Sequence, residues 1–240
     1  MKLVCLGSSS SGNCYLLQCA GETLILEAGV KFTDIKKSLN FQLGGIVGAL
    51  VTHRHNDHSL CVDDLAKAGI HVYSNADVAE VHKNHFVHSI EPMKVHRIGG
   101  FAVMALNAVH DVPCYAYVIK HDEFGKMLFV TDSAAFDYSI KGVNHLLIEA
   151  NYEDSILDDN IKNGIEVPSQ RTRLLQTHCE INTSIRIIKA QDATNVVEVV
   201  LLHLSSRNSD TDRFKTMVER ATGIPTYIAK KGFQIELTND

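Results

Sequence analysis

Hydrophobic residues in the first half of the chain gather in short runs that are rich in β-branched and aliphatic side chains. Runs of about four to eight such residues, bounded by glycine, serine or asparagine, are typical of β-strands, and several follow one another closely enough to form hairpins. The pattern predicts strands over residues 2–6, 15–18, 24–27, 46–52, 70–73, 94–97, 101–108, 115–120 and 126–131.

Between these runs, and more often in the second half, apolar positions three and four residues apart indicate amphipathic helices. Asn182 or Thr183, and Ser209 or Asp210, are suitable N-caps for the last two of them. The predicted helices span residues 32–39, 60–68, 76–84, 155–162, 169–175, 183–191 and 210–221. Further strands are predicted over residues 145–149, 196–202, 226–228 and 232–237.

Hairpin strands mixed with helices in both halves predict an α/β fold with two sheets. Each sheet would be covered by helices on its outer face, which makes a four-layer αββα sandwich. The chain has no internal repeat, no low-complexity run and only four prolines, so nothing in it resembles a linker between domains. We therefore expect residues 1–240 to form a single domain.

The composition, with 45% hydrophobic and 21% charged residues, is that of a globular protein. The longest apolar stretches, residues 44–51 and 196–202, are much shorter than the roughly 20 residues that cross a bilayer. We therefore expect a cytoplasmic protein with no membrane partner. The net charge of −5 excludes a global positive field, so any phosphate binding has to be local. The six cysteines include no C-x-x-C pair, which argues against a disulfide framework and a cysteine zinc site.

The thirteen histidines are clustered, and the densest group directly follows one of the predicted strands. His53, His55, Asp57 and His58 place four metal-binding side chains within six residues. A strand that ends in a loop can turn alternate side chains toward one point, and a helix beginning near Ser59 can present the last two to a second point. Imidazole and carboxylate together suit zinc, manganese or iron, so a metal site is favoured over a polar surface loop.

This H-x-H-x-D-H segment resembles the first metal motif of the metallo-β-lactamase-fold superfamily of binuclear metallohydrolases. The resemblance implies three further ligands, each at the end of an apolar strand. His110, Asp132 and His203 each follow one of the predicted strands, in the order that the superfamily has them. Singly each is a weak signal, because such residues are common in solvated loops, but together they support the resemblance.

The resemblance implies two divalent metal ions, zinc or manganese. Its ligand sets are His53, His55 and His110 for one ion, Asp57, His58 and His203 for the other, and Asp132 bridging both. Asp57 is also a candidate for moving protons. Two such ions lower the pKa of a bridging water and clamp the oxygens of a phosphodiester during in-line displacement. The implied reaction is attack on phosphorus by a metal-bridged hydroxide.

Four segments resemble one branch of the superfamily, the bacterial and phage proteins similar to the WalJ (YycJ) exonuclease. The first is the glycine-serine-rich LGSSSSGNCY of residues 6–15, which on composition alone is equally compatible with a flexible hairpin loop. The others are LEAG at residues 26–29, IEAN at residues 148–151, and LHLS at residues 202–205 with Asn208.

Departures from the branch pattern lie near the implied site. Glu27 stands where the branch has aspartate, so its carboxylate reaches one methylene further. Tyr152 and Glu153 stand where the branch has histidine and aspartate. His178 lies in a segment that keeps the branch's histidine and asparagine. We expect His178 to bind the scissile phosphate or protonate the leaving group; the alternative is a surface histidine beside a helix.

Arg171 and Arg173 lie just before this candidate catalytic histidine. Guanidinium groups bind phosphate bidentately, so we expect at least one of the two arginines to contact substrate; the alternative is a pair of solvated side chains. Arg207, Lys230 and Lys231 are weaker candidates for the same role.

The other histidines give little sign of a metal site. His82, His85 and His88 lie between predicted elements, and we expect them on an exposed helix end rather than at a third metal. The isolated histidines are expected to be ordinary surface or hydrogen-bonded residues: His71, His96, His121 and His145.

The resemblance implies a metal-dependent phosphodiesterase that hydrolyses DNA, most simply an exonuclease, with DNA as its partner. An alternative is a small-molecule hydrolase of the same fold, acting on a cyclic nucleotide or an ester, and a third is a non-catalytic binding module. A basic groove through Arg171 and Arg173 to the metals would favour DNA, whereas a closed apolar pocket would favour a small substrate. The strand polarity, the active metal and the oligomeric state do not follow from the sequence.

Overall fold

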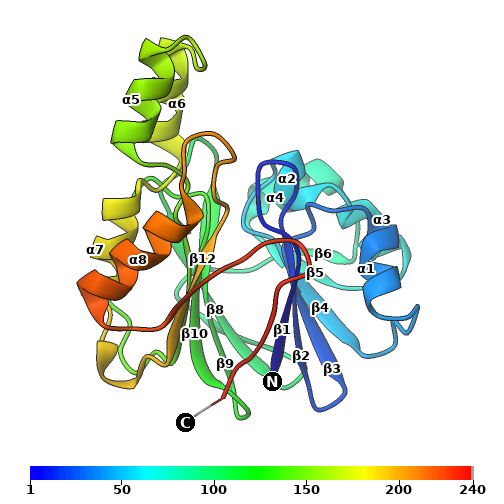
Figure 1. Cartoon of the computed structure of the whole chain (residues 1–240). Helices are drawn as coiled ribbons and strands as arrows, with labels where there is room; N and C mark the ends of the chain where they lie inside the picture. The colour runs from blue at the N-terminus through cyan, green and yellow to red at the C-terminus, as the bar shows by residue number, and fades with distance from the viewer. Residues whose placement is uncertain (239–240) are drawn as a thin grey trace.

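Two seven-stranded β-sheets face each other, and helices cover the outer face of each sheet (Figure 1). The structure is a computed structural model that describes residues 1–238, with the backbone alone at Ala193. The predicted α/β fold with four αββα layers is confirmed.

The first sheet has the strand order β14-β1-β2-β3-β4-β5-β6. Strands β14 and β1 to β3 are antiparallel neighbours, and β3 to β6 are parallel. The strands span Lys2–Gly7 (β1), Cys14–Cys19 (β2), Glu22–Leu26 (β3), Ile46–Leu50 (β4), Val72–Ser74 (β5), Val87–Ser89 (β6) and Gln234–Glu236 (β14).

The second sheet has the order β13-β12-β11-β10-β9-β8-β7. Strands β7 to β10 are antiparallel, and β10 to β13 are parallel. The strands span Val95–Ile98 (β7), Phe101–Ala108 (β8), Cys114–His121 (β9), Gly125–Val130 (β10), His145–Glu149 (β11), Glu198–Leu202 (β12) and Thr226–Ile228 (β13).

Helices lie on both outer faces, and one helical pair projects beyond the sheets (Figure 1). Four short helices accompany the first sheet: α1 (Phe32–Ser38), α2 (Asn56–Ser59), α3 (Val62–Lys67) and α4 (Ala76–His82). Helices α7 (Ile181–Ala190) and α8 (Thr211–Thr222) cover the second sheet. Helices α5 (Asp154–Lys162) and α6 (Pro168–Thr177) form the projecting hairpin.

The strands are apolar on both faces because both faces are buried. In β1, Leu3 and Cys5 point into the core between the sheets, whereas Val4 packs beneath the helices of the first sheet. Phe101 and Phe129 fill the same central core from the second sheet. Strands buried on both faces read as continuous apolar runs rather than as alternating ones, and this is why so many of them were predictable.

The structure corrects three local predictions. The segment from His82 to His88 is not one exposed helix end, because α4 ends at His82 and His88 belongs to the short edge strand β6, where its Nε2 lies 2.7 Å from Nδ1 of His71. The helix at the metal motif begins at Asn56, not near Ser59. The N-cap of α7 is Glu180, whose carboxylate accepts two backbone N–H groups of the first turn.

Within residues 1–238, no helix combines the length and the apolar character needed to cross a membrane.

Candidate metal centre

The candidate ligands lie where strands of both sheets end, at one edge of the sandwich. His53 and His55 follow β4, Asp132 follows β10, and His203 follows β12. Carboxyl ends of parallel neighbouring strands meet at the same edge of a sheet, so residues far apart in sequence converge there. The loop between β8 and β9 adds His110 from the second sheet.

The first cluster consists of three imidazoles, His53, His55 and His110, whose nitrogens face one another. The Nδ1 atom of His55 lies 3.0 Å from Nε2 of His53 and 3.3 Å from Nε2 of His110. The outward nitrogen of His110, Nδ1, lies 2.9 Å from the carbonyl oxygen of Thr177 and can donate its proton there. The inward Nε2 of His110 is therefore left as a lone-pair donor, the arrangement that metal-binding histidines adopt.

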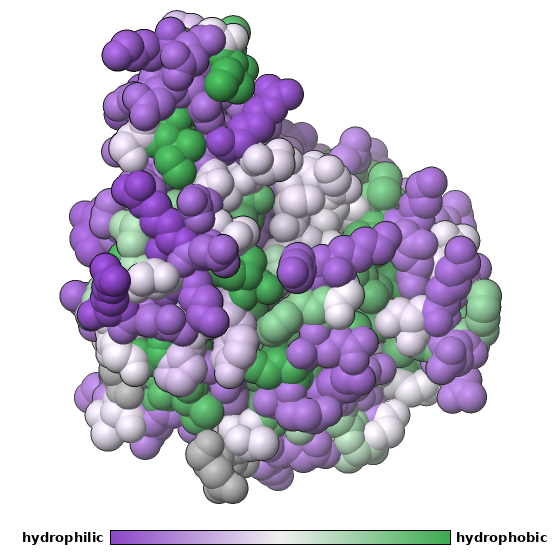
Figure 2. All heavy atoms as spheres, viewed as in Figure 1, coloured by the Kyte–Doolittle hydropathy of each residue, from purple (hydrophilic) through white to green (hydrophobic). Residues whose placement is uncertain are grey.

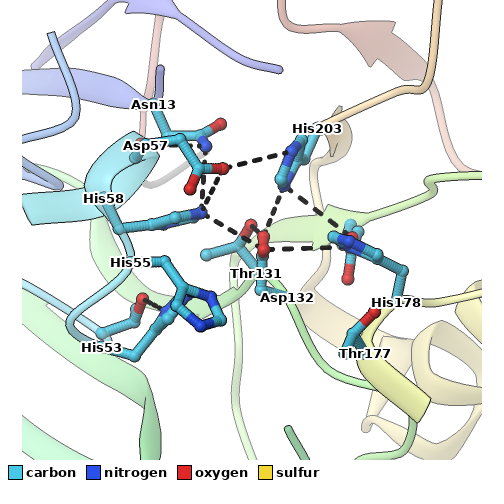
Figure 3. A network of polar contacts seen from close by, with 12 residues as sticks. Asn13, His53, His55, Asp57, His58, Thr131, Asp132, Thr177, His178 and His203 are labelled. Atoms are coloured by element: carbon cyan, nitrogen blue, oxygen red, sulfur yellow. Dashed lines mark hydrogen bonds and ion pairs between the residues drawn. The ribbon is translucent and has the colours of Figure 1, made fainter. Parts of the chain in front are cut away.

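The second cluster contains Asp57, His58, Asp132 and His203 (Figure 3). The Nε2 atom of His58 lies 3.4 Å from Oδ2 of Asp57 and 3.3 Å from Oδ2 of Asp132. The Nδ1 atom of His203 is hydrogen-bonded to Oδ1 of Asp132. Asp132 thus contacts both histidines of this cluster, and its role as a ligand shared with the three imidazoles stays a prediction.

Not every nitrogen and oxygen of the two clusters has a hydrogen-bond partner within the protein, as expected if some of them bind a metal. The Nε2 atom of His203 is buried and has no hydrogen-bond partner among the described residues. An unpartnered buried polar atom is costly, and an imidazole nitrogen in that state is a ready ligand. The two buried clusters of histidine and aspartate are consistent with a binuclear metal site, and nitrogen with carboxylate oxygen suits zinc, manganese or iron.

Charges in the second cluster stabilise one another. Burial alone would raise the pKa of Asp132, but the imidazoles of His203 and His58 hold this pKa well below its usual value. Burial alone would lower the pKa of His58, but the carboxylates of Asp132 and Glu27 hold it well above its usual value. Burial lowers the pKa of His53. The site thus holds its carboxylates ionised, as a divalent cation requires of its carboxylate ligands, whereas His58 would have to release a proton in order to bind one.

Glu27 supports His58 from behind. Its side chain is fully buried, and Oε1 lies 3.4 Å from Nδ1 of His58, while Oε2 accepts the backbone N–H of Thr52. On the other side of the ring, the side-chain amide of Asn13 lies 3.0 Å from Nε2. A carboxylate behind a histidine orients the ring toward a metal. The longer glutamate therefore still reaches the histidine.

Three non-glycine residues at the site have left-handed backbones: Glu27 with φ 64°, Asp132 with φ 47° and His203 with φ 52°. This region costs a non-glycine residue of the order of 1 kcal/mol or more, and it is found where side chains must point in an unusual direction. The turns after β3, β10 and β12 thus adopt unfavourable backbone conformations, and these conformations direct the three side chains inward.

Sequence reasoning overlooked the role of Glu149. This fully buried carboxylate lies 2.6 Å from Nδ1 of His178 and accepts the backbone N–H groups of Ser133 and Cys179. His178 is consequently not a loose surface residue, and its Nδ1 lies 3.8 Å from Oδ2 of Asp132. Glu149 belongs to the IEAN segment. Its position at the end of an apolar strand, β11, could have marked it as a candidate site residue.

The arginines and Tyr152 lie beside the centre rather than in it. Arg171 forms ion pairs with Asp154 and Asp158 on the projecting hairpin, and Arg173 is exposed. Phosphate contact by these arginines stays a prediction. Tyr152 is buried and packs against the base of the same hairpin.

Two further groups were not anticipated. Asp111 places a carboxylate 3.1 Å from Nε2 of His110, at the exposed side of the first cluster. At the strand turns of β2 and β9, Cys19, His121 and Glu123 form another group with ligand atoms within 4.8 Å of one another. His121 was expected to be an ordinary surface or hydrogen-bonded histidine, and its contact with Cys19 joins the two sheets.

Comparisons with known proteins agree with this geometry. A family model described as a beta-lactamase superfamily domain matches residues 31–204. Exodeoxyribonuclease WalJ of Streptococcus pneumoniae is 27% identical over a region that covers 63% of this chain and 63% of WalJ, so the match spans less than two thirds of that relative.

Solved structures share the fold at low identity. The metallo-beta-lactamase fold protein YhfI of Bacillus subtilis superimposes with a TM-score of 0.76 at 19% identity, covering 98% of both chains. Zinc-bound PqqB of Methylobacterium extorquens gives a TM-score of 0.74 at 16% identity, covering 99% of this chain and 100% of PqqB. Since the family model spans more than half of the chain and the two-sheet architecture agrees with it, this protein belongs to the metallo-β-lactamase superfamily.

Proposed function

We propose that this protein is a metal-dependent phosphodiesterase that degrades DNA from a strand end. The observation that carries the proposal is the pair of clusters, one of three imidazoles and one that contains Asp132, with His178 held beside the second. Two adjacent cation sites and a positioned imidazole are the elements that phosphodiester hydrolysis requires. The similarity to WalJ supports DNA as the substrate.

Seven residues would hold two divalent ions, of which zinc and manganese are the candidates. They are His53, His55, Asp57, His58, His110, Asp132 and His203. When bound, such ions activate water as the nucleophile and neutralise charge on the phosphate oxygens. No serine or cysteine nucleophile is then required.

The protein's own groups would handle the protons. Nδ1 of His178 is held by Glu149, so Nε2 is the atom that can meet a substrate oxygen, either to bind the phosphate or to protonate the leaving group. The hydrogen bond from His58 holds the pKa of Asp57 below its usual value, although burial opposes this. Asp57 is thus ionised and able to accept a proton from the attacking water.

The proposal is tested with duplex and single-stranded DNA labelled separately at the 5′ and 3′ ends, with manganese or zinc supplied. The wild-type protein is expected to release nucleotides from one end, and His58→Ala to lose at least about 1,000-fold in rate because an ion site is broken. His85→Ala, which removes an exposed histidine that belongs to neither cluster, serves as the matched control.

Intact DNA under every metal condition would refute the nuclease proposal. Cyclic nucleotides and small esters are assayed in parallel, because the fold alone does not select the substrate. Hydrolysis of one of these by the wild type but not by His58→Ala would assign the small-molecule alternative.

A further inference from the structure

A pocket of about 550 Å³ lies next to the candidate metal centre. Its walls are the loop after β1, the start of α1 and the turn after β13, which bring together Ser9, Ser11, Lys31, Lys230 and Lys231. Figure 2 shows a row of strongly hydrophilic atoms crossing the front of the molecule where Figure 1 draws the turn after β13. A pocket of this size lies in the range that holds small ligands or parts of larger ones.

One loop separates the pocket from the metal centre. Ser8, which lines the pocket, accepts the backbone N–H of the candidate ligand His203 on its hydroxyl oxygen. Asn13, at the end of the same loop, contacts the ring of His58. A chain that leaves the metal centre over this loop therefore enters the pocket directly.

Tight backbone packing holds this loop in place. A Cβ on Gly12 would lie 2.3 Å from the carbonyl oxygen of Gly29, and a Cβ on Gly29 would lie 1.7 Å from that of Asp57. Gly12 has φ 143°, which other residues rarely adopt. The glycines of residues 6–15 and 26–29 thus let the loop pack against the metal motif. The glycine-serine segment is a packed wall and not a flexible hairpin.

The cations of the pocket are available for a ligand, unlike most arginines around the centre. Within residues 1–238, no ion pair joins Lys31, Lys230 or Lys231 to a carboxylate, although Asp34 lines the same pocket. Several arginines nearer the projecting hairpin and α4 are already neutralised: Arg54 by Asp77, Arg171 by Asp154 and Asp158, Arg207 by Glu166, and Arg213 by Glu153.

We propose that this lysine pocket binds backbone phosphates of the DNA strand next to the scissile phosphate. The proposal rests on the proposed function and adds the path that the strand takes. Three ammonium groups beside the serine hydroxyls of this loop match a phosphate chain, which binds through charge and hydrogen bonds without reading base sequence. The pocket also supplies the local positive surface that the net charge of −5 lacks.

The test is the steady-state cleavage of a labelled oligonucleotide by Lys230→Ala/Lys231→Ala across a range of salt concentrations. Each phosphate contact with a single strand contributes about 0.7 to the slope of log affinity against log salt. The double variant should therefore show a slope of log KM shallower by about 1.4, and a KM raised on the order of 10-fold at about 0.1 M salt. The value of kcat should change far less, because the metal ligands are untouched.

The matched control is Lys67→Ala/Lys189→Ala, which removes two exposed lysines that do not line the pocket. Equal salt slopes for the two double variants would overturn the pocket proposal. If the salt slope of log KM became shallower only in Arg171→Ala/Arg173→Ala, the DNA strand would run along α6 instead. That result would also overturn the pocket proposal. In both cases wild-type cleavage still supports the nuclease function, whereas absence of wild-type cleavage refutes that function itself.

Discussion

Oε1 of Glu149 lies 2.6 Å from Nδ1 of His178, and the two residues come from separate elements, the end of β11 and the end of α6. Glu149 is fully buried and its other oxygen accepts two backbone N–H groups, so the carboxylate cannot turn away. The pair therefore fixes the direction of the imidazole next to the candidate metal centre. His178 is thus held in place, although it follows a projecting helix.

Replacing Glu149 is expected to impair catalysis rather than binding. Glu149→Gln keeps the size of the side chain but loses the charge that orients His178, so kcat should fall about 10- to 100-fold with little change in KM. Steady-state DNA cleavage measures both constants. Glu198→Gln is the control, since Glu198 pairs with His145 away from the centre. An unchanged kcat in Glu149→Gln would contradict the proposed role of His178 in the reaction.

The same pair should make stability depend on pH in the metal-free protein. Burial opposes protonation of His178, but the carboxylate of Glu149 raises its pKa to about 9. The folded pKa exceeds the unfolded value of about 6.5, so the stabilisation is complete below pH 6.5 and is lost as the pH rises through 9. The loss is on the order of 3 kcal/mol.

Chemical unfolding in EDTA measures this effect as a difference between variants. The gap in unfolding free energy between the wild type and Glu149→Gln should be large at pH 6 and shrink by pH 10. Comparing the two proteins cancels the titration of other groups, since both carry them. A gap that does not change with pH would contradict the assignment.

Asp132→Asn should lower metal content without unfolding the protein. Asparagine tolerates the left-handed backbone that Asp132 adopts, so the turn is preserved while the shared carboxylate is lost. We expect fewer than two ions per chain by elemental analysis and a cleavage rate reduced at least about 1,000-fold. Circular dichroism checks the fold, and retention of two ions would show that Asp132 is not a shared ligand.

Metal binding should raise the thermal midpoint of the protein. A ligand present at about 1,000 times its Kd stabilises the folded state by roughly 4 kcal/mol. For a chain of this length that corresponds to about 8–16 °C. Thermal denaturation with EDTA, and then with zinc or manganese, measures the shift. His58→Ala should lose most of it, and a wild type that does not respond to either ion would count against a metal centre.

Glu27→Gln should weaken metal binding although Glu27 is no ligand in this arrangement. The carboxylate faces Nδ1 of His58, and glutamine keeps the acceptor for Thr52 but removes the charge. Loss of such a supporting carboxylate typically costs 10- to 100-fold in metal affinity. Competition with a chelator gives the affinity, and a change below about 3-fold would show that the His58 ring is held by Asn13 alone.

The sequence by itself determined the strands and the ligand motif. Residues 145–149 and 226–228 were predicted to the residue, and the apolar run at the centre of the first is fully buried. The family resemblance implied three further ligands, and His110, Asp132 and His203 were chosen as candidates because each follows an apolar strand. The short strand β6 was missed, since three residues at a sheet edge, of which only Val87 is buried, carry no detectable period.

Only the tertiary structure decided which side chains support these residues. Glu149 meets His178, and Glu27 meets His58, through the packing of separate strands, loops and helices, which no local pattern encodes. The lysine pocket likewise joins residue 31 to residues 230–231 across almost the whole chain. Periodicity reports how one segment faces the core, whereas a site depends on where several strand ends meet, and that is set by strand order and loop closure.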